Sequence, residues 1–339
     1  MESTKNVQLV ISPKSFSQEM IQFSISTFAI FLSAFLSNIN FSVAAMFLSH
    51  GNDSEVEMAA FSISNSFRVI TGEAIILSLN QGTSILLSQA FGFKDVNLAR
   101  LYFKRNFIFF GFVIIVYSIL NVFNYPILKG IGVSENIASK AYRYLQLEIL
   151  HTFLYGLVDL IKSLLISQKI FRVHLFFTII FFGLYFLMSF VFLKILNLGL
   201  IGLAFVDISC DIYLLICYCS FCFYKRNQIE LGLVGKFFSK EIFNLRKIVE
   251  LVKRNFEISS CFLINLLSTS LNSLLFFPLC SENDLAAYSG AISAYIPLLI
   301  FGSSLPVTVS VILAKNSGKG DIKHVIIILF VFNNPFIIN

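Results

Sequence analysis

Four carboxylates lie inside long apolar segments, where an ionised side chain costs at least ~2.5–3.5 kcal/mol on insertion scales. Two of them, Asp207 and Asp211, stand four residues apart in one apolar run. On a helix this spacing puts both side chains on one face, a single turn apart. Like charges in a low dielectric repel each other, so at least one of the two is expected to hold a proton. The pair therefore predicts reversible proton binding, unless Asp207 only caps or pairs near a helix end.

The other two membrane carboxylates are Glu73 and Asp159. Arg68 precedes Glu73 by five residues, about 140° round an α-helix, and is therefore a poor local partner. We expect Glu73 to bind a proton or cation from a cavity, or to pair with a basic group on another helix. Asp159 has Lys162 three residues on, so an intrahelical ion pair is the first expectation and an ion site the second.

Neutral polar residues and prolines in the apolar segments are candidates of a second kind. Asn38, Asn40 and Asn265 either hydrogen-bond between helices, the commoner use of such residues in membranes, or contribute to a ligand site. Pro297 and Pro306 leave backbone carbonyls unbonded, and each either provides a hinge or is merely tolerated.

No residue pattern in the sequence predicts covalent chemistry or a metal site. Cys217, Cys219 and Cys222 are closely spaced, but in a lipid-facing helix without a nearby His they act as small apolar residues. The four His are scattered, and the sequence has no Gly-x-Ser-x-Gly or paired-Asp motif. We therefore predict no catalytic residue, no metal and no cofactor, and we disfavour a membrane-embedded enzyme.

Hydropathy predicts the elements that carry these residues. The chain is 57% hydrophobic and 13% charged, with a mean hydropathy of +0.82. In soluble domains about 45–50% of residues are apolar and about 25% are charged. About 20 apolar residues cross a ~30 Å hydrocarbon core as a helix. Such runs lie at about 21–47, 58–90, 104–128, 147–168, 173–194, 198–224, 252–279, 285–314 and 324–339. We predict an all-α integral membrane protein, a polytopic bundle of about 8–9 transmembrane helices.

The second run is too long for a simple crossing, since about 33 residues at ~1.5 Å each make ~50 Å. It must tilt, bend or project, and Gly72 and Gly82 are places for a bend. A basic stretch, 225–251, follows the sixth run. The apolar residues in its part Phe237–Leu251 have helical spacing, which predicts an amphipathic helix on the inner membrane face. The predicted division is a tail (1–20), a six-helix lobe (21–224), this linker (225–251) and a partial second lobe (252–339).

The ends of the second and eighth runs are alike. Gly92 and Asp95 correspond to Gly318 and Asp321 at a constant offset of 226. In both copies a long apolar helix ends at a Gly-x-x-Asp turn, where the Gly is expected to cap the helix and the Asp to cap the next one. Six helices separate the copies, so the repeat predicts that 58–95 superposes on about 284–321 by rotation about the membrane normal.

Three short segments carry a family resemblance: Ser-Gln-Ala-Phe-Gly-Phe-Lys at 88–94, Ser-Gln at 167–168, and Leu-Gly-Leu-Ile-Gly-Leu-Ala at 198–204. They resemble motifs at the end of the second helix, the end of the fourth and the start of the sixth in the MATE (multidrug and toxic compound extrusion) family. The resemblance runs over about residues 20–325. It implies a secondary active antiporter that exports organic, often cationic, compounds in exchange for H⁺ or Na⁺ by alternating access of two lobes.

The sequence departs from the family pattern in two ways. The resemblance implies twelve helices, whereas the sequence ends inside the ninth, so we expect a second lobe that is C-terminally truncated. The acidic residues that many members carry in the second and seventh helices fall here on Ser84 and near Ile264 and Asn265. Two alternatives therefore stay open: a lipid-linked oligosaccharide flippase of the same superfamily, and a non-transporting remnant.

The basic residues are distributed by topology. With the N-terminus inside, the inner segments carry 19 of the 25 Lys and Arg residues and the outer segments only four, as the positive-inside rule requires. The net charge of +6 therefore indicates no nucleic-acid partner. The expected partners are the lipid bilayer, small organic solutes and H⁺ or Na⁺, in a membrane that the sequence does not identify.

This topology predicts a cytosolic N-terminus and an outer loop at 49–57, where Asn52-Asp53-Ser54 is a glycosylation acceptor. A tag at residue 1 should be reachable only in permeabilised cells, and Asn52 should accept a glycan. A tag reachable from outside intact cells would reverse the topology.

Overall fold

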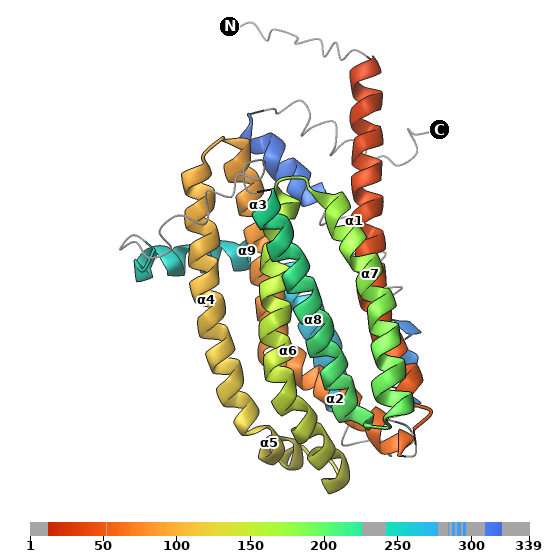
Figure 1. Cartoon of the computed structure of the whole chain (residues 1–339). Coiled ribbons are helices and arrows are strands. Elements are labelled where there is room, and N and C mark those ends of the chain that lie inside the picture. Colours follow the sequence, from red (N-terminus) through yellow and green to blue (C-terminus); the bar gives the residue numbers. More distant parts are fainter. Residues whose placement is uncertain are drawn as a thin grey trace, which may run out of the picture.

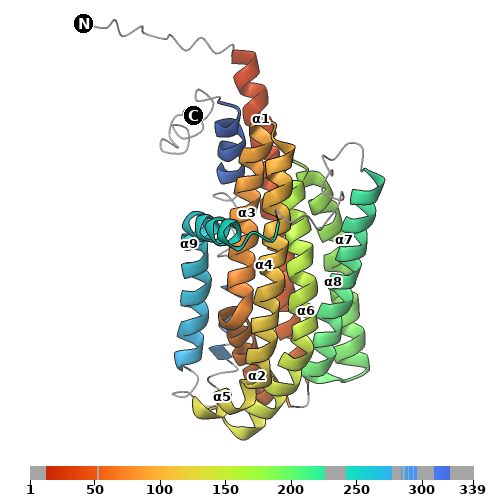
Figure 2. The same cartoon turned by 90° about the vertical axis from the view of Figure 1, so that its left-hand side faces the viewer.

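The computed structural model describes residues 13–51, 53–225, 242–276 and 309–320, with isolated positions between 284 and 295. Every regular element in these parts of the chain is helical. Figures 1 and 2 show long helices side by side in a bundle, with the short α5 at the end opposite the start of α1. The predicted all-α fold class is confirmed.

Six of the helices that the structure describes are long and apolar enough to cross a membrane, at Ser24–Leu48, Val96–Val122, Glu135–Ser167, Phe171–Ile195, Gly199–Tyr224 and Leu245–Leu275. They match the predicted runs apart from the second, the eighth and the ninth. The helix bounds are α1 (Pro13–Leu48), α2 (Ser54–Arg68), α3 (Ala74–Gly92), α4 (Val96–Val122), α5 (Asn124–Gly130), α6 (Glu135–Ser167), α7 (Phe171–Ser189), α8 (Gly199–Tyr224) and α9 (Leu245–Phe276). Two π-helical segments, η1 (Val69–Glu73) and η2 (Phe190–Ile195), continue α2 and α7.

The second predicted run is one helical stretch made of α2, η1 and α3. Its interruption includes Gly72, one of the two predicted positions, whereas Gly82 lies inside α3. A Cβ on Gly72 would lie 2.7 Å from a ring carbon of Tyr117 on α4, so glycine lets the two helices approach there. The π-helical hydrogen bonds run from i to i+5, which changes the side-chain directions that α-helical spacing predicts.

The end of α3 differs from its prediction. The residue with positive φ is Lys94 (61°), and the amides of Lys94 and Asp95 donate to the carbonyls of Phe91 and Ala90, which is the Schellman pattern. Gly92 is therefore a helical residue and not the cap, so that prediction was wrong. Asp95 does cap α4, accepting from the amide of Leu98 at 2.9 Å, as predicted.

The main apolar core lies between α1, α2, α6, α7 and α8. Its largest fully buried side chains include Tyr144, Leu145 and Ile63. The start of α9 buries Ile248 and Leu251 and exposes the residues between them, so the described part of the predicted amphipathic helix has one apolar face. Residues 237–241 lie outside the described part of the chain.

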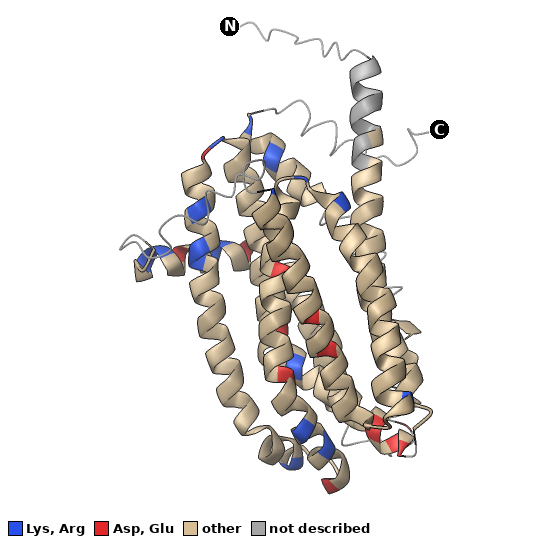
Figure 3. Cartoon of the chain, in the orientation of Figure 1, with Lys and Arg blue, Asp and Glu red and all other residues tan. Residues whose placement is uncertain are grey.

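Many of the charged residues lie at the two ends of the bundle, and others lie along α9 and inside the bundle (Figure 3). We call one the basic end, where the helix ends carry Lys94, Lys169, Lys225 and Lys319. The other, the acidic end, carries Asp53, Glu55, Glu57 and Glu135 together with Lys129 and Lys140.

Several predictions fall on residues that the structure does not describe. They are the hinges at Pro297 and Pro306, glycosylation at Asn52, the ninth run and most of the second repeat copy. The domain division at 224/225 also stays a prediction, since 226–241 are not described.

Gly199, at the start of α8, has a φ of +56°, and a Cβ there would lie 2.8 Å from the carboxyl carbon of Glu57. We expect Gly199→Ala to destabilise the protein by at least about 1 kcal/mol, since an L-residue is strained in this conformation and the carboxylate must move. Thermal unfolding in detergent measures this. Gly183→Ala on α7, where a Cβ meets nothing within 4 Å, should not lower the melting temperature, since Ala favours a helix more than Gly does; equal losses would contradict the explanation.

Candidate functional site

A buried guanidinium lies at the centre of the bundle. Arg68 Nε is 3.1 Å from Glu73 Oε2, and Arg68 Nη1 donates to Glu148 Oε2 at 2.7 Å. The expectation that Arg68 cannot reach Glu73 was wrong, because η1 lies between them and i to i+5 periodicity brings residues five apart together. Glu73 therefore has an ion-pair partner on its own helix, and Arg68 joins it to α6.

An imidazole and a second carboxylate continue this group between α6 and α8. His151 Nδ1 lies 2.8 Å from Asp211 Oδ2, and its Nε2 lies 3.8 Å from Glu148 Oε2. Asp211 and Glu148 are buried, with side-chain exposures of 3% and 0%. The predicted helix face of Asp207 and Asp211 is thus directed at α6.

Asp207 is held by two phenols. Tyr185 on α7 donates to Oδ1 at 3.0 Å, and Tyr144 on α6 donates to Oδ2 at 3.4 Å. Neither partner carries a positive charge, so these contacts stabilise either a carboxylate or a carboxylic acid that is still an acceptor. Asp207 lies within the bundle, so a simple capping role at its helix end does not apply.

We call Arg68, Glu73, Glu148, His151, Asp207 and Asp211 the charged cluster. It contains four carboxylates, one guanidinium and one imidazole. With the carboxylates ionised it has an excess of negative charge, whether or not the imidazole is protonated. Oε1 of Glu148 is buried without a hydrogen-bond partner among the described residues. His151 Nδ1 and Asp211 Oδ2, although close, are not aligned as a hydrogen bond. Such a cluster has unused capacity to bind protons or a cation.

A second polar group lies further along α6 toward the basic end. The predicted Asp159–Lys162 ion pair is present. Asn80 Nδ2 donates to Asp159 Oδ2 at 3.1 Å, and Asn106 Nδ2 donates to Asn80 Oδ1 at 3.0 Å. Unlike the charged cluster, this group has balanced charges, so it ties α3, α4 and α6 together without an excess to neutralise.

The remaining predicted residues do not join the charged cluster. Asn38 donates to the carbonyl of Ala34 at 2.8 Å. This hydrogen bond lies within α1, whereas a bond between helices was expected. Asn40 is buried, and its Oδ1 has no hydrogen-bond partner among the described residues. Asn265 is exposed on α9.

Sequence reasoning missed Glu148 and His151. The fourth run was predicted to begin at 147, which left Glu148 at a helix end, but α6 begins at Glu135 and places it well inside. The signal was present in the spacing. Polar or titratable residues repeat every three or four positions and so share one helix face, at Tyr144, Glu148, His151, Tyr155, Asp159 and Lys162.

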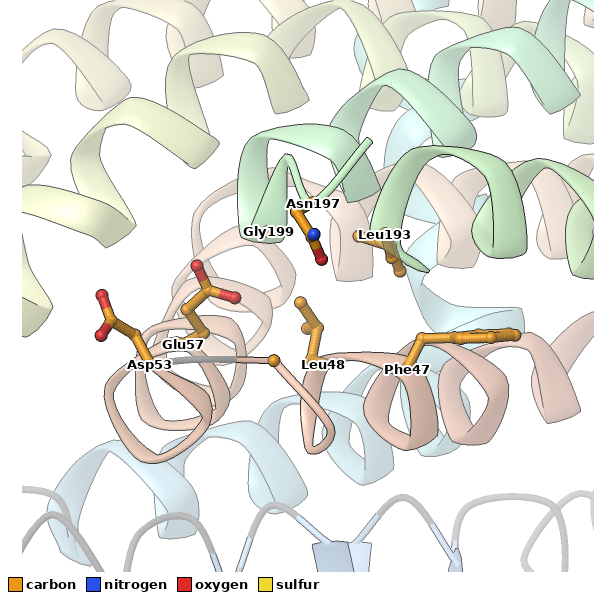
Figure 4. A pocket seen from close by; sticks show the side chains of 8 residues that line it. Phe47, Leu48, Asp53, Glu57, Leu193, Asn197 and Gly199 are labelled. Atoms are coloured by element: carbon orange, nitrogen blue, oxygen red, sulfur yellow. The ribbon is translucent and has the colours of Figure 1, made fainter. Parts of the chain in front are cut away.

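A pocket of about 360 Å³ lies at the acidic end between α1, the start of α2 and the start of α8 (Figure 4). Asp53 and Glu57 both face Lys140, at 2.8 and 3.6 Å. The hydrogen bond and charge of Lys140 lower the pKa of Asp53. Burial raises the pKa of Glu57 more than Lys140 lowers it. Lys140 is paired with both carboxylates, so it is not a free cation for a ligand.

The family model MatE matches residues 29–191, which include the whole charged cluster except Asp207 and Asp211. Four curated relatives also match, and all four are DETOXIFICATION proteins of Arabidopsis thaliana. Protein DETOXIFICATION 48 is 28% identical over 50% of this chain, and Protein DETOXIFICATION 29 is 31% identical over 27%. The segment 29–191, nearly half of the chain, belongs to the MATE family. The matched segments span only 32% and 18% of these two relatives' own lengths.

Solved MATE structures share the fold. The crystal structure of the eukaryotic MATE transporter AtDTX14 aligns with a TM-score of 0.80 at 17% identity, over 93% of this chain and 69% of that one. The Vibrio cholerae MATE transporter VcmN aligns with a TM-score of 0.76 at 14% identity, over 94% and 70%. The chain is thus a multi-pass membrane protein with the MATE fold, in agreement with the prediction that it is no enzyme.

Arg68→Met should be strongly destabilising, by about 3–5 kcal/mol, because it leaves Glu73 and Glu148 without their cation. Adding Glu148→Gln should restore part of the loss, since one of the two uncompensated charges is removed. Recovery of folded protein after detergent extraction, with its melting temperature, measures both variants. A double variant no better than Arg68→Met alone would contradict the pairing.

Proposed function

We propose that this MATE-family chain is the transporting unit, or part of it, of a proton-coupled antiporter that exports organic, often cationic, compounds. The observation that carries the proposal is the excess negative charge of the charged cluster, buried between α2, α6 and α8. Charges that are expensive to bury ionised must be neutralised when the site is closed to water. Protons or a cationic solute can supply that neutralisation, and exchange of one for the other is antiport.

Two features favour protons over sodium as the coupling ion. Among the described residues, no three His, Cys, Asp or Glu side chains are placed to hold a metal ion together, whereas Na⁺ needs several oxygens at one point. The carboxylates instead face Arg68, His151 or a tyrosine hydroxyl. Single carboxylates of this kind bind protons one at a time.

The arrangement of the cations disfavours the flippase alternative. A phosphate-bearing lipid needs free Arg or Lys side chains. Arg68 is engaged by Glu73 and Glu148, and Lys162 by Asp159. These two cations are therefore already neutralised, while the carboxylates of the charged cluster are in excess. This balance suits a cationic solute.

The orientation of the chain is part of the proposal. The basic end carries the Lys-rich turns after α3, α6 and α8, and such turns are retained in the cytosol. The N-terminus then lies in the cytosol, and export runs from the basic end to the acidic end.

The proposal is tested with the full-length protein in liposomes that have an acidic lumen. Protons leaving the lumen should drive uptake of a fluorescent organic cation such as ethidium. Glu73→Gln and Asp211→Asn should each reduce this uptake by about tenfold or more, within the usual range of coupling free energies between two ligands.

Asp53→Asn is the matched control, since it removes a carboxylate that lies at the acidic end beside Lys140; its uptake should equal that of the parent. Uptake driven by a sodium gradient and indifferent to pH would refute the proton as coupling ion. No gradient-driven uptake by the parent protein would refute the proposed transport itself.

A further inference from the structure

The two copies of the sequence repeat touch each other at equivalent residues. A Cβ built on Gly92 would lie 2.9 Å from Cα of Gly318 and would also meet the carbonyl oxygen of Lys315. A Cβ built on Gly318 would lie 3.1 Å from Cα of Gly92 and would also meet the carbonyl oxygen of Gln89. Each contact is the counterpart of the other at the offset of 226.

Two further pairs with the same offset extend this correspondence. Ile85 and Val311 pack in one apolar cluster with Ala29 and Ile30 of α1. Lys94 and Gly320, which follow the two helix ends, both have positive φ, 61° and 73°. The contact residues of α3 are spaced by four and three positions and therefore share a helix face. The surfaces are self-complementary, as surfaces related by a two-fold axis are.

The neighbours of these glycines are backbone atoms of the other segment. This distinguishes them from Gly72 and Gly156, whose nearest neighbours are the side chains of Tyr117 and Phe110. A ring can turn away from an added methyl group, but a helix backbone yields only if the helix moves. Close approach of this kind is what small residues permit between membrane helices.

The crossing lies at the basic end, where the segment 309–318 runs beside the end of α3 (Figure 1) and packs through Val311 against Ala29 and Ile30, near the middle of α1. Gly92 and Gly318 are both buried, as is Ser88, one turn earlier on α3, with an exposure of 0%. The crossing thus covers the inner ends of both repeat copies.

We infer that the Gly92–Gly318 crossing is the surface on which the two repeats close the basic end of the protein, each repeat being the partner of the other. The role of the crossing in closure rests on the proposed function, because a transporter must close one end while the other is open. The crossing itself is a matter of packing and can be tested without transport.

The test uses Ser88→Cys as a reporter in a chain whose six native Cys are replaced by Ser or Ala. A membrane-impermeant maleimide should label Cys at position 88 slowly in the parent. Gly92→Ala and Gly318→Ala should each speed the labelling from the basic end by about tenfold, since the added methyl holds the helices apart. The double variant should be no faster than either single one, because both changes break one contact.

Two glycine controls separate this inference from general destabilisation. Gly183→Ala meets nothing within 4 Å and should neither change the labelling nor lower the melting temperature. Gly156→Ala clashes with Phe110 inside the bundle and should lower the melting temperature without exposing position 88. Equal labelling in Gly156→Ala and Gly92→Ala, unchanged labelling in either interface variant, or additive effects in the double variant would each overturn the inference.

If an alanine variant is not recovered folded, Val311→Ala provides the second measurement. It removes volume from the same crossing, where Val311 is fully buried, and should also speed labelling. Leu145→Ala, equally buried in the main core, should not, and the reverse order would overturn the inference. Labelling needs neither ion gradient nor solute, so a failure of transport with this labelling pattern intact would refute only the proposed function.

Discussion

The structure depends on the burial of one guanidinium among apolar helices. Arg68 has no place in a hydrocarbon core unless carboxylates surround it, and it has two, one on its own helix and one on α6. Its pairing with Glu73 requires the π-helical η1, since an α-helix would turn the two side chains apart. Gly72 inside η1 brings the same helix against Tyr117 of α4. The ion pairs, the helix interruption and the approach of α4 are therefore consequences of one another.

Hydropathy predicted the fold because lipid imposes one rule on every residue. Backbone groups must be bonded within the segment, so long apolar runs had to be helices. Most of their C-terminal ends were found within a few residues, whereas α1, α4, α6 and α9 begin about seven to twelve residues before the predicted runs. The charged cluster was predicted only in part. Asp207 and Asp211 share a face by simple periodicity. The pairing of Glu73 with Arg68 instead depends on η1, and the place of Glu148 well inside a helix depends on the twelve residues of α6 that precede its apolar run. Neither feature can be predicted from a hydropathy window or an ideal helical wheel.

The repeat gives a second contrast between pattern and geometry. An offset of 226 can be read from the sequence, and it predicted two similar helix ends. It did not predict that Gly92 and Gly318 touch, because the equivalence of two segments says nothing of their distance. The structural role of the two glycines was also predicted wrongly. A glycine near a helix end is usually a cap, yet positive φ falls two residues later, on Lys94 and Gly320, and the two glycines are left free for close approach.

The two kinds of contact differ in what it takes to separate them. Inside α1 to α8, helices are joined by ion pairs and by hydrogen bonds such as Asn80 to Asp159, whose loss inside a membrane leaves unpaired polar groups. At the Gly92–Gly318 crossing the touching atoms are backbone carbons and carbonyls already used within each helix. Separating them forfeits dispersion contacts, each individually small, and leaves no charge uncompensated. A bundle built this way can move as a unit while its charged cluster stays intact. Under the proposed function, only the protons or solute bound to the cluster would then change between the two states.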